Sequence, residues 1–386
     1  MRPTLFVMVI AMVAMAGIVC LDLQPVHAGE QSSASGFKVL EPIRHGSLTV
    51  FPVVAPKSYA TGEFLTLDEG LRSGEVVVTE FGNVRGLLRR HITPAIQHDN
   101  AEVNRLVLIN NSKHPLLLLA GEIVAGGKQD RVIGKDRIVP AESDPVDLSV
   151  FCVEPGRWVA TSDRFGASGT TYGAGVGGGS AGGVAASTET LMVQPSVRAK
   201  AMADKDQNQV WDEVRKQQSS MAVEVAAASP QASTSEIRST SSYARVMENK
   251  DVKEKVDEVA KPIEQNYKSL IKQLRDRKAV GVVVAVNGRI IWSDVFASTE
   301  LLEKYWPKLV RSYASEAVVT RAKGGEASQA KAQTFLDETE GRRETIESEP
   351  GIYRHTEING DGFRAFALTS LLPNTGFDVH VAKMAE

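Results

Sequence analysis

The feature that most constrains the fold is a pair of apolar segments in the last third of the chain. Residues 279–286 form a continuous, mostly β-branched run, and residues 289–296 are expected to form the returning strand. Such a run is typical of a strand that is buried on both faces. Asn287-Gly288 stands between the segments, and this dipeptide is the strongest short-range signal for a β-hairpin. The sequence therefore predicts a buried hairpin.

Helices are predicted before and after this hairpin. Residues 196–218 and 242–277 have helical patterns, and in the second region apolar residues recur every three or four positions. We expect this stripe to pack on the protein's own sheet, with a coiled-coil partner as the alternative, and Pro262 predicts a kink or a restart. A further helix that begins near Ser298 or Thr299 would bury Leu301, Leu302, Tyr305, Leu309 and Tyr313.

The N-terminal part of the chain is predicted to be rich in strands. The candidate strands are residues 48–54, 75–80, 104–110, 115–120, 137–140 and 145–151. A single helical turn is expected at 66–71, capped by Thr66 or Asp68, and a turn at 110–114 joins the third and fourth strands. Strands at this spacing indicate a β-sandwich or a barrel-like module.

Residues 166–189 are dominated by glycine, serine and alanine. This composition is typical of a flexible linker, because it offers too little apolar surface to offset the entropy of ordering. A phosphate-binding glycine loop is the alternative, but no predicted strand precedes it.

The predicted fold class is α+β: an N-terminal β-rich sandwich or barrel-like module, central helices, and a small C-terminal sheet with a packed helix. The expected organisation begins with a signal peptide at 1–28, a β-rich part at 37–162 and a flexible insertion at 163–195. A helical region, hairpin and helix at 196–318, a charged loop at 319–350 and C-terminal strands at 351–386 follow. A poorly packed helix is the alternative for residues 320–350.

Residues 1–28 have a basic start, an apolar middle and small residues at the exit, which predicts a secretory signal peptide cleaved after Ala28. An uncleaved membrane anchor and a lipoprotein modified at Cys20 are the alternatives. We therefore expect a periplasmic or extracellular protein with no membrane contact after cleavage. Cleavage would leave Cys152 as the only cysteine, so no internal disulfide is expected.

The charge balance restricts the partners. The chain has 44 Lys and Arg against 47 Asp and Glu, a net charge of −3. A general nucleic-acid binder carries a basic surplus, so no nucleic-acid partner is expected. A small anionic ligand remains the expected partner.

Two blocks between Leu116 and Trp158 carry the candidate binding residues. In the first, Glu122 precedes a Gly126-Gly127 turn, and Lys128, Gln129 and Arg131 follow it. Backbone N–H groups and cations beside such a turn suit phosphate, carboxylate or sugar phosphate, whereas the structural alternative is a solvated hairpin tip with surface ion pairs.

The second block contains Glu154, Arg157 and Trp158. An aromatic ring beside a guanidinium can hold a planar or sugar ring by stacking, and a carboxylate can accept its hydrogen bonds. The alternative is that Trp158 packs in the core and that Arg157 forms a structural bridge with Glu154 or Glu122. A shared site requires that the two blocks converge in the fold.

Other reactive residue types give no recognisable motif. Cys152 lies inside an apolar strand and no histidine is near it in sequence, so a buried structural cysteine is expected. No zinc-ligand spacing, nucleophile elbow or Walker loop is present, and neither a metal nor a cofactor is predicted. Asp294 is expected to form hydrogen bonds at a strand end, with a role as an acid as the alternative.

The chain resembles the bacterial ADP-ribosylglycohydrolase and rhodanese-phosphatase-superfamily-associated (ARPP) domain family. The resemblance rests on residues 48–54, 120–122 with 126–131, 139–141, 152–158, 210–214, and 281–296 followed by the helix at 301–313. The family name records a genomic association, which implies a role near ADP-ribose or phosphate-ester metabolism. It implies no particular catalytic residue.

Taken with the residues themselves, these patterns predict an exported binding module for a small phosphate-like or nucleotide-like anion. The residues expected to line its site are Glu122, Lys128, Gln129, Arg131, Glu154, Arg157 and Trp158. One alternative is a hydrolase of phosphorylated or ADP-ribosyl substrates that uses Glu122 or Glu154 as general base. The other is a structural or protein-interaction module of the cell envelope.

Overall fold

A computed structural model describes residues 36–80, 105–156, 164–166, 190–229, 234–274, 277–321 and 325–386. The chain divides into residues 1–32 and residues 33–386, and every described residue lies in the second unit. This unit has an α+β fold with a large antiparallel sheet and a closed barrel. The predicted signal peptide and residues 167–189 of the predicted insertion lie outside the described residues.

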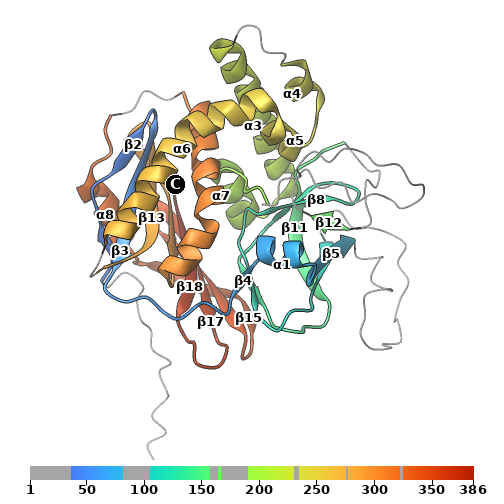
Figure 1. Ribbon diagram of the computed structural model, residues 1–386, viewed down its shortest axis with the longest axis vertical. Coiled ribbons are helices and arrows are strands. Elements are labelled where there is room, and N and C mark those ends of the chain that lie inside the picture. Colours follow the sequence, from blue (N-terminus) through green and yellow to red (C-terminus); the bar gives the residue numbers. More distant parts are fainter. Residues whose placement is uncertain are drawn as a thin grey trace, which may run out of the picture. The chain divides into compact units, whose positions relative to one another are not determined.

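The largest element is a nine-stranded antiparallel sheet (Figure 1). Its strand order is β1-β3-β13-β14-β18-β17-β16-β15, and β2 also pairs with β3. The strands are β1 (Lys38–Val39), β2 (Ile43–His45), β3 (Leu48–Ala55), β13 (Lys278–Val286), β14 (Arg289–Phe296), β15 (Gly341–Glu349), β16 (Tyr353–Gly360), β17 (Phe363–Ser370) and β18 (Asp378–Ala385). The sheet therefore joins segments from both ends of the described chain.

The predicted hairpin of β13 and β14 is confirmed. Its turn residues Asn287 and Gly288 have φ values of 50° and 78°, the left-handed region that a tight two-residue hairpin turn requires. β13 pairs with β3 on one side and with β14 on the other, and all of its residues except Lys278 are buried.

Helices cover both faces of this part of the sheet (Figure 1). α6 (Lys250–Gln273) and α7 (Thr299–Val319) share a core with Val50 and Val282, whereas α8 (Gln329–Asp337) packs with Phe51 and Val283 on the other face. Neighbouring residues of a strand point to opposite faces, which explains this division. The predicted packing of the α6 stripe on the protein's own sheet is confirmed, and α6 continues through Pro262 without a restart.

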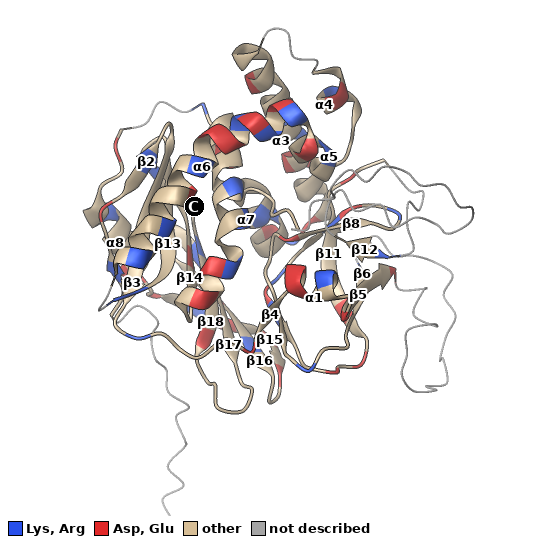
Figure 2. Cartoon of the chain, viewed as in Figure 1, with Lys and Arg blue, Asp and Glu red and all other residues tan. Residues whose placement is uncertain are grey.

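The outer side of α6 is highly charged, with basic and acidic residues alternating along the helix (Figure 2). Lys250–Glu254, Lys261–Asp257 and Lys268–Glu264 are ion pairs at i,i+4 spacing. Each such pair stabilises a helix by only a few tenths of a kcal/mol, so packing of the inner side is the main stabilising contribution.

The barrel-like module is a closed barrel with strand order β11-β6-β5-β12-β8-β9. Its strands are β5 (Val76–Glu80), β6 (Arg105–Asn110), β8 (Ile123–Gly126), β9 (Arg131–Ile133), β11 (Val146–Cys152) and β12 (Phe165–Gly166). A separate three-stranded sheet consists of β4 (Leu65–Thr66), β7 (Leu116–Leu118) and β10 (Arg137–Val139). Several of its apolar side chains share one cluster with those of the barrel strands. α1 (Leu67–Ser73) begins after Thr66, which forms a reciprocal capping box with Glu69.

The remaining helices pack against the barrel and α7. They are α2 (Pro195–Ala199), a π-helical turn (Lys200–Asp204), α3 (Gln207–Ala228), α4 (Ser235–Ser239) and α5 (Tyr243–Glu248). Val197, Val210 and Tyr243 form one apolar cluster with Ile123 and Val132 of the barrel strands. The predicted helix at 196–218 is interrupted because Lys205 adopts a left-handed conformation with φ of 53°.

Two expected connections are wrong. The turn at 110–114 does not make a hairpin, because β6 pairs with β5 and β11 whereas β7 pairs with β10 and β4. The Asn110 amide donates to the carbonyls of His114 and Pro140 and so directs the chain out of the barrel. The segment 319–350 is not a charged loop: it contains α8, which agrees with the helix that was the alternative, and β15, which was not expected.

The C-terminal strands are part of the nine-stranded sheet rather than a separate small one. β15 pairs with β16 through backbone hydrogen bonds, which need no apolar side chains, and most of its side chains are exposed. At the ends of the predicted insertion 163–195, Phe165–Gly166 forms β12, and Thr190 and Met192 are buried.

We expect Gly281→Ala to destabilise the sheet. A Cβ at this position would lie 2.3 Å from the Asp294 carbonyl oxygen and 2.8 Å from Val295 Cα, so β13 and β14 would have to move apart. The expected loss is about 3 kcal/mol of unfolding free energy in urea. Gly325→Ala is the control, because no described atom lies within 4 Å of its added Cβ. Equal stability of the two variants would contradict the close approach.

Candidate functional site

A buried ion cluster joins three distant parts of the chain. The Lys308 ammonium of α7 lies 2.7 Å from Glu122 Oε1 and also pairs with the Asp68 carboxylate in the first turn of α1. It donates a third hydrogen bond, 3.0 Å long, to the Thr190 hydroxyl. The three charged side chains are at most 8% exposed. Since an ammonium has three N–H donors, these partners use all of them.

Backbone groups fix both carboxylates. Glu122 Oε2 accepts the Leu119 N–H at 2.8 Å, and Asp68 Oδ1 accepts the Thr190 N–H at 2.5 Å. Glu122 also forms an isolated antiparallel bridge with Met192. The segments around Glu122 and Thr190 are therefore held side by side against α7.

Burial and mutual attraction set the protonation of this cluster. Burial raises the pKa of Glu122; Lys308 opposes this rise and Asp68 adds to it. Burial disfavours the charged form of Lys308, but Glu122 and Asp68 outweigh that effect, and the pKa of Lys308 is raised. Lys308 is thus cationic at neutral pH, and the surroundings of Glu122 favour its neutral form more than water does.

A pocket of about 230 Å³ opens onto the cluster. Its lining residues are Thr190, Leu191, Met192, Met247, Glu248, Lys253, Val256, Asp257, Lys308, Arg311 and Ser315. Lys253, Lys308 and Arg311 are the cations of the lining and Glu248 and Asp257 its acids, while Asp68 and Glu122 pair with Lys308 from behind the lining. The pocket therefore combines an apolar wall with a cationic one.

The two cations at the edge of the pocket differ in their surroundings. Arg311 Nε lies 3.2 Å from Asp257 Oδ1, and its second contact, to Glu264, is 3.4 Å long. Lys253 is exposed and has no ion-pair partner within the described part of the chain. Lys253 is consequently the cation that is most available to a ligand.

The two predicted blocks converge, but they do not line this pocket. The Gln129 amide donates to the Glu154 carbonyl at 3.1 Å, and Glu154 Oε2 accepts the Asp130 N–H at 3.1 Å. Gln129, Arg131 and Glu154 are buried at the barrel, and the Lys128 N–H donates to Glu80 Oε1 at 2.9 Å. Arg157 and Trp158 lie outside the described residues, so the stacking prediction stays a prediction.

Of the predicted residues, Glu122 belongs to the cluster at the pocket, where it contacts Lys308. Sequence reasoning missed Asp68, Thr190, Lys253, Lys308 and Arg311 as site residues. For Lys308 a signal existed: Leu301, Tyr305, Lys308 and Ser312 share one helical face, and a single cation on a buried face needs a partner. Asp68 was expected only as a possible cap.

Cys152 is buried in β11, as expected for a structural cysteine. Burial raises the pKa of its thiol, which disfavours the nucleophilic thiolate. Within the described residues, no group of three or more His, Cys, Asp or Glu side chains is arranged to hold a metal ion. No helix in the described ranges has both the length and the apolar character that crossing a bilayer requires.

A second buried cluster centres on His380 of β18. Its Nδ1 lies 2.6 Å from Asp136 Oδ2, and its Nε2 lies 3.1 Å from Asp294 Oδ1. Asp294 also accepts hydrogen bonds from Arg198, at 2.8 Å, and from the Tyr313 hydroxyl. The hydrogen-bonding role expected for Asp294 is therefore present.

The charges of this cluster stabilise one another. Burial opposes the charged form of each group, yet Arg198 and His380 hold the pKa of Asp294 well below its usual range, and the two aspartates raise the pKa of His380 to about 9. His380 and Asp294 have 0% side-chain exposure and Arg198 has 1%, and neither pocket described here includes them. We therefore assign this cluster to joining the segment before β10 with β14, β18 and α2, not to binding.

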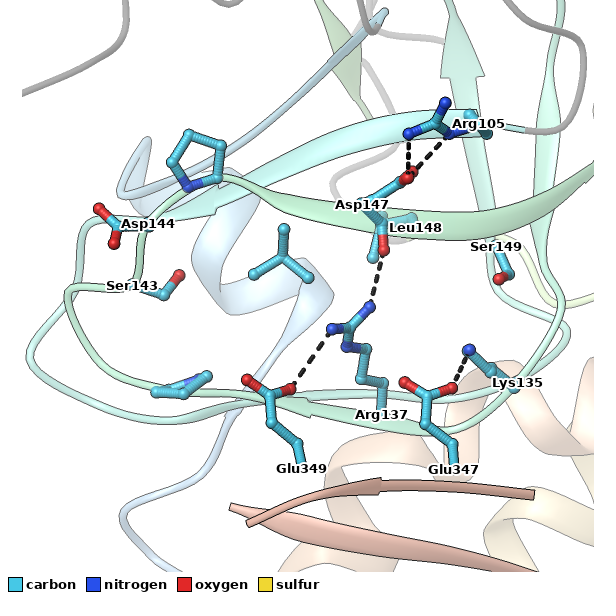
Figure 3. A pocket seen from close by; sticks show the side chains of 13 residues that line it. Arg105, Lys135, Arg137, Ser143, Asp144, Asp147, Leu148, Ser149, Glu347 and Glu349 are labelled. Carbon is cyan, nitrogen blue, oxygen red and sulfur yellow. Dashed lines mark hydrogen bonds and ion pairs between the residues drawn. The ribbon is translucent and has the colours of Figure 1, made fainter. Parts of the chain in front are cut away.

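A larger groove of about 780 Å³ lies between the barrel and β15 (Figure 3). Its three cations are paired inside the groove: Arg105 with Asp147, Lys135 with Glu347, and Arg137 with Glu349. With Asp144, four acids face these three cations, a surplus of one negative charge. Each cation of this groove thus has an acidic partner, which makes the groove less suited to an anion than the pocket, where Lys253 has no ion-pair partner among the described residues.

We expect His380 to make stability depend on pH. Its folded-state pKa of about 9 exceeds the ordinary value of 6.5, so its contribution is complete below pH 6.5 and is lost as the pH rises through 9. The difference in unfolding free energy between the wild type and His380→Gln should shrink by about 3 kcal/mol from pH 6 to pH 10 in urea titrations. His45→Gln, at an exposed site, is the control. A difference that does not vary with pH would contradict a protonated His380.

Comparison with known protein families identifies the family of this chain. The chain matches the model of the ARG and Rhodanese-Phosphatase-superfamily-associated Protein domain over residues 36–383. Comparisons with curated proteins and with solved structures found no match. The matched range includes the barrel, the helices and most of the nine-stranded sheet. The chain therefore belongs to the ARG and Rhodanese-Phosphatase-superfamily-associated Protein domain family.

Proposed function

We propose that the protein binds a small anionic ligand in the pocket at Lys308. The observation that carries this proposal is Lys253, an exposed cation with no ion-pair partner among the described residues, on a pocket that is otherwise partly apolar. Lys253 and Arg311 are positioned to meet a charged head, while Leu191, Met192 and Met247 offer contacts to an apolar body. Charge-assisted hydrogen bonds to such cations favour carboxylate and phosphate groups.

The dimensions of the pocket favour a small ligand. A volume of about 230 Å³ lies below the roughly 300–1,000 Å³ that is usual for drug-sized ligands. A short organic acid or a small phosphate ester fits this size better than an intact nucleotide. The ligand class proposed here is therefore an anionic head with a short apolar body.

A hydrolase is the second candidate, and the raised pKa of Glu122 is the observation that favours it. However, Glu122 is 0% exposed and lies behind Lys308, and Glu154 is buried at the barrel. A general base must reach the proton that it removes, so the burial of these carboxylates favours binding over hydrolysis. Turnover of a bound ester that is lost in Glu122→Gln would reverse this preference.

Export is part of the proposal and is supported by the sequence pattern of residues 1–28 alone. A purely structural or protein-interaction role in the cell envelope is the remaining alternative. It is distinguished from the other two by ligand binding, because a structural module gains no stability from small anions.

The proposal predicts thermal stabilisation by small organic anions. A screen of short carboxylates and phosphate esters should raise the melting temperature, and it should do so less at high salt because the contacts are ionic. Uncharged amides of the same length are the matched controls. If no anion raises the melting temperature more than its amide, the binding proposal is wrong.

Lys253→Gln and Arg311→Gln should each weaken binding about three- to fivefold in calorimetric titrations, since each removes one partly exposed cation from the pocket. The control is Lys272→Gln, which removes an exposed cation near the opposite end of α6. Equal affinities for all three variants would place the ligand elsewhere.

A further inference from the structure

We propose that the pocket takes up its anion together with one proton, and that Glu122 holds this proton. The inference rests on the proposed binding function and specifies how the same site is regulated. Uptake of a proton implies that the natural ligand binds more tightly as the pH falls. The argument depends on the contacts of Lys308, on the number of buried charges, and on which carboxylate can change its charge.

All three ammonium hydrogens of Lys308 are already used. Two are directed to the carboxylates of Asp68 and Glu122, and the third is directed to the Thr190 hydroxyl at 3.0 Å. An anion that reaches Lys308 must therefore replace one partner. Thr190 is the uncharged partner and lines the pocket, whereas Asp68 and Glu122 do not line it. The Thr190 hydroxyl is thus the contact that an anion replaces.

This exchange places three anionic groups around one ammonium. The side chains of Lys308, Asp68 and Glu122 are 4%, 8% and 0% exposed, so water screens their mutual repulsion only weakly. Neutralising one carboxylate restores the charge balance that exists before the anion enters. The proton comes from solvent, and the complex then contains one anion, one carboxylate and one neutral carboxyl group beside Lys308.

Glu122 is the carboxylate whose surroundings favour the neutral form. It is the more deeply buried of the two, and burial already raises its pKa. Its Oε2 accepts the Leu119 N–H, so the Oε1 that faces Lys308 is the oxygen whose environment the incoming anion changes. A proton on Glu122 removes one negative charge and leaves both contacts of Asp68, with Lys308 and with the Thr190 N–H, in place.

The other ionisable groups around the site do not neutralise the added negative charge in place of this proton. Tyr305 of α7 is neutral, because burial holds its pKa well above the ordinary value. Asp257 of α6 is neutralised by Arg311 and Lys261, and Lys253 is exposed to solvent. The groups that face the site are Asp68 from α1, Glu122, Glu248 from α5, Lys253 and Asp257 from α6, and Tyr305, Lys308 and Arg311 from α7.

The test is calorimetric titration of the mature chain with hexanoate and with sulfate between pH 6 and pH 9. Both probes stay ionised in this range, so any linked proton belongs to the protein. Measurements in two cationic buffers with different heats of ionisation give the number of protons taken up. We expect close to one proton per anion and a dissociation constant that rises up to about tenfold per pH unit. Hexanamide is the uncharged control and should show no proton uptake.

Glu122→Gln keeps the shape and cannot titrate, and its single amide oxygen accepts from either the Leu119 N–H or Lys308. We expect it to bind without proton uptake and with a dissociation constant that does not change with pH, so that at pH 9 it binds up to about a thousandfold more tightly than the wild type. Glu258→Gln, on the exposed side of α6, is the matched control and should behave as the wild type. If Glu122→Gln does not fold, Asp68→Asn removes the like charge and should lower the uptake.

The outcomes separate the two proposals. Wild-type binding with no proton uptake and no pH dependence overturns this inference but leaves the proposed function in place. Proton uptake that persists unchanged in Glu122→Gln, or in Asp68→Asn where only that variant folds, also overturns the assignment to Glu122. Failure of both probes to bind at every pH overturns the inference and the proposed function together.

Discussion

The structure depends on buried charges that meet around the segment from Leu119 to Glu122. On one side of this segment, Asp136 accepts the Ala120 N–H at 2.7 Å and is tied through His380 to the nine-stranded sheet. On the other side, Glu122 pairs with Lys308 of α7. Between them, Gly121 has a φ of 97°, and a Cβ there would lie 3.0 Å from the Arg198 side chain. A short turn thereby connects the barrel region, the sheet and two helices.

Charges this deeply buried are tolerated only when each has partners, because an isolated ion loses far more hydration than folding returns. The two clusters meet this requirement in different ways. His380 and Arg198 lie opposite two aspartates, which gives a balanced set, whereas Lys308 alone faces Asp68 and Glu122. The excess of acid at Lys308 leaves that cluster, unlike the other, with one carboxylate more than it has cations.

Much of the local structure could be predicted from short patterns. The β13–β14 hairpin follows from a β-branched run and an Asn-Gly turn, and α7 begins at Ser298 because that hydroxyl accepts the Leu301 N–H. β15 could not be predicted in this way, since its charged residues carry no apolar alternation and its pairing with β16 uses only the backbone. For the site, Glu122 was found because it precedes a glycine turn, but its partners are distant in sequence.

The sequence by itself determined the β13–β14 hairpin, α7, the α+β class and the family, since these depend on local turn chemistry, periodicity and contiguous motif blocks. Only the tertiary structure decided which charges meet. Asp68, Glu122, Thr190 and Lys308 come from four separate segments, and nothing in their local patterns links one to another. Long-range packing of the sheet, the barrel and α7 brings them together. Burial of the apolar faces fixes the positions of the few polar groups on them, and these groups need partners where they are buried.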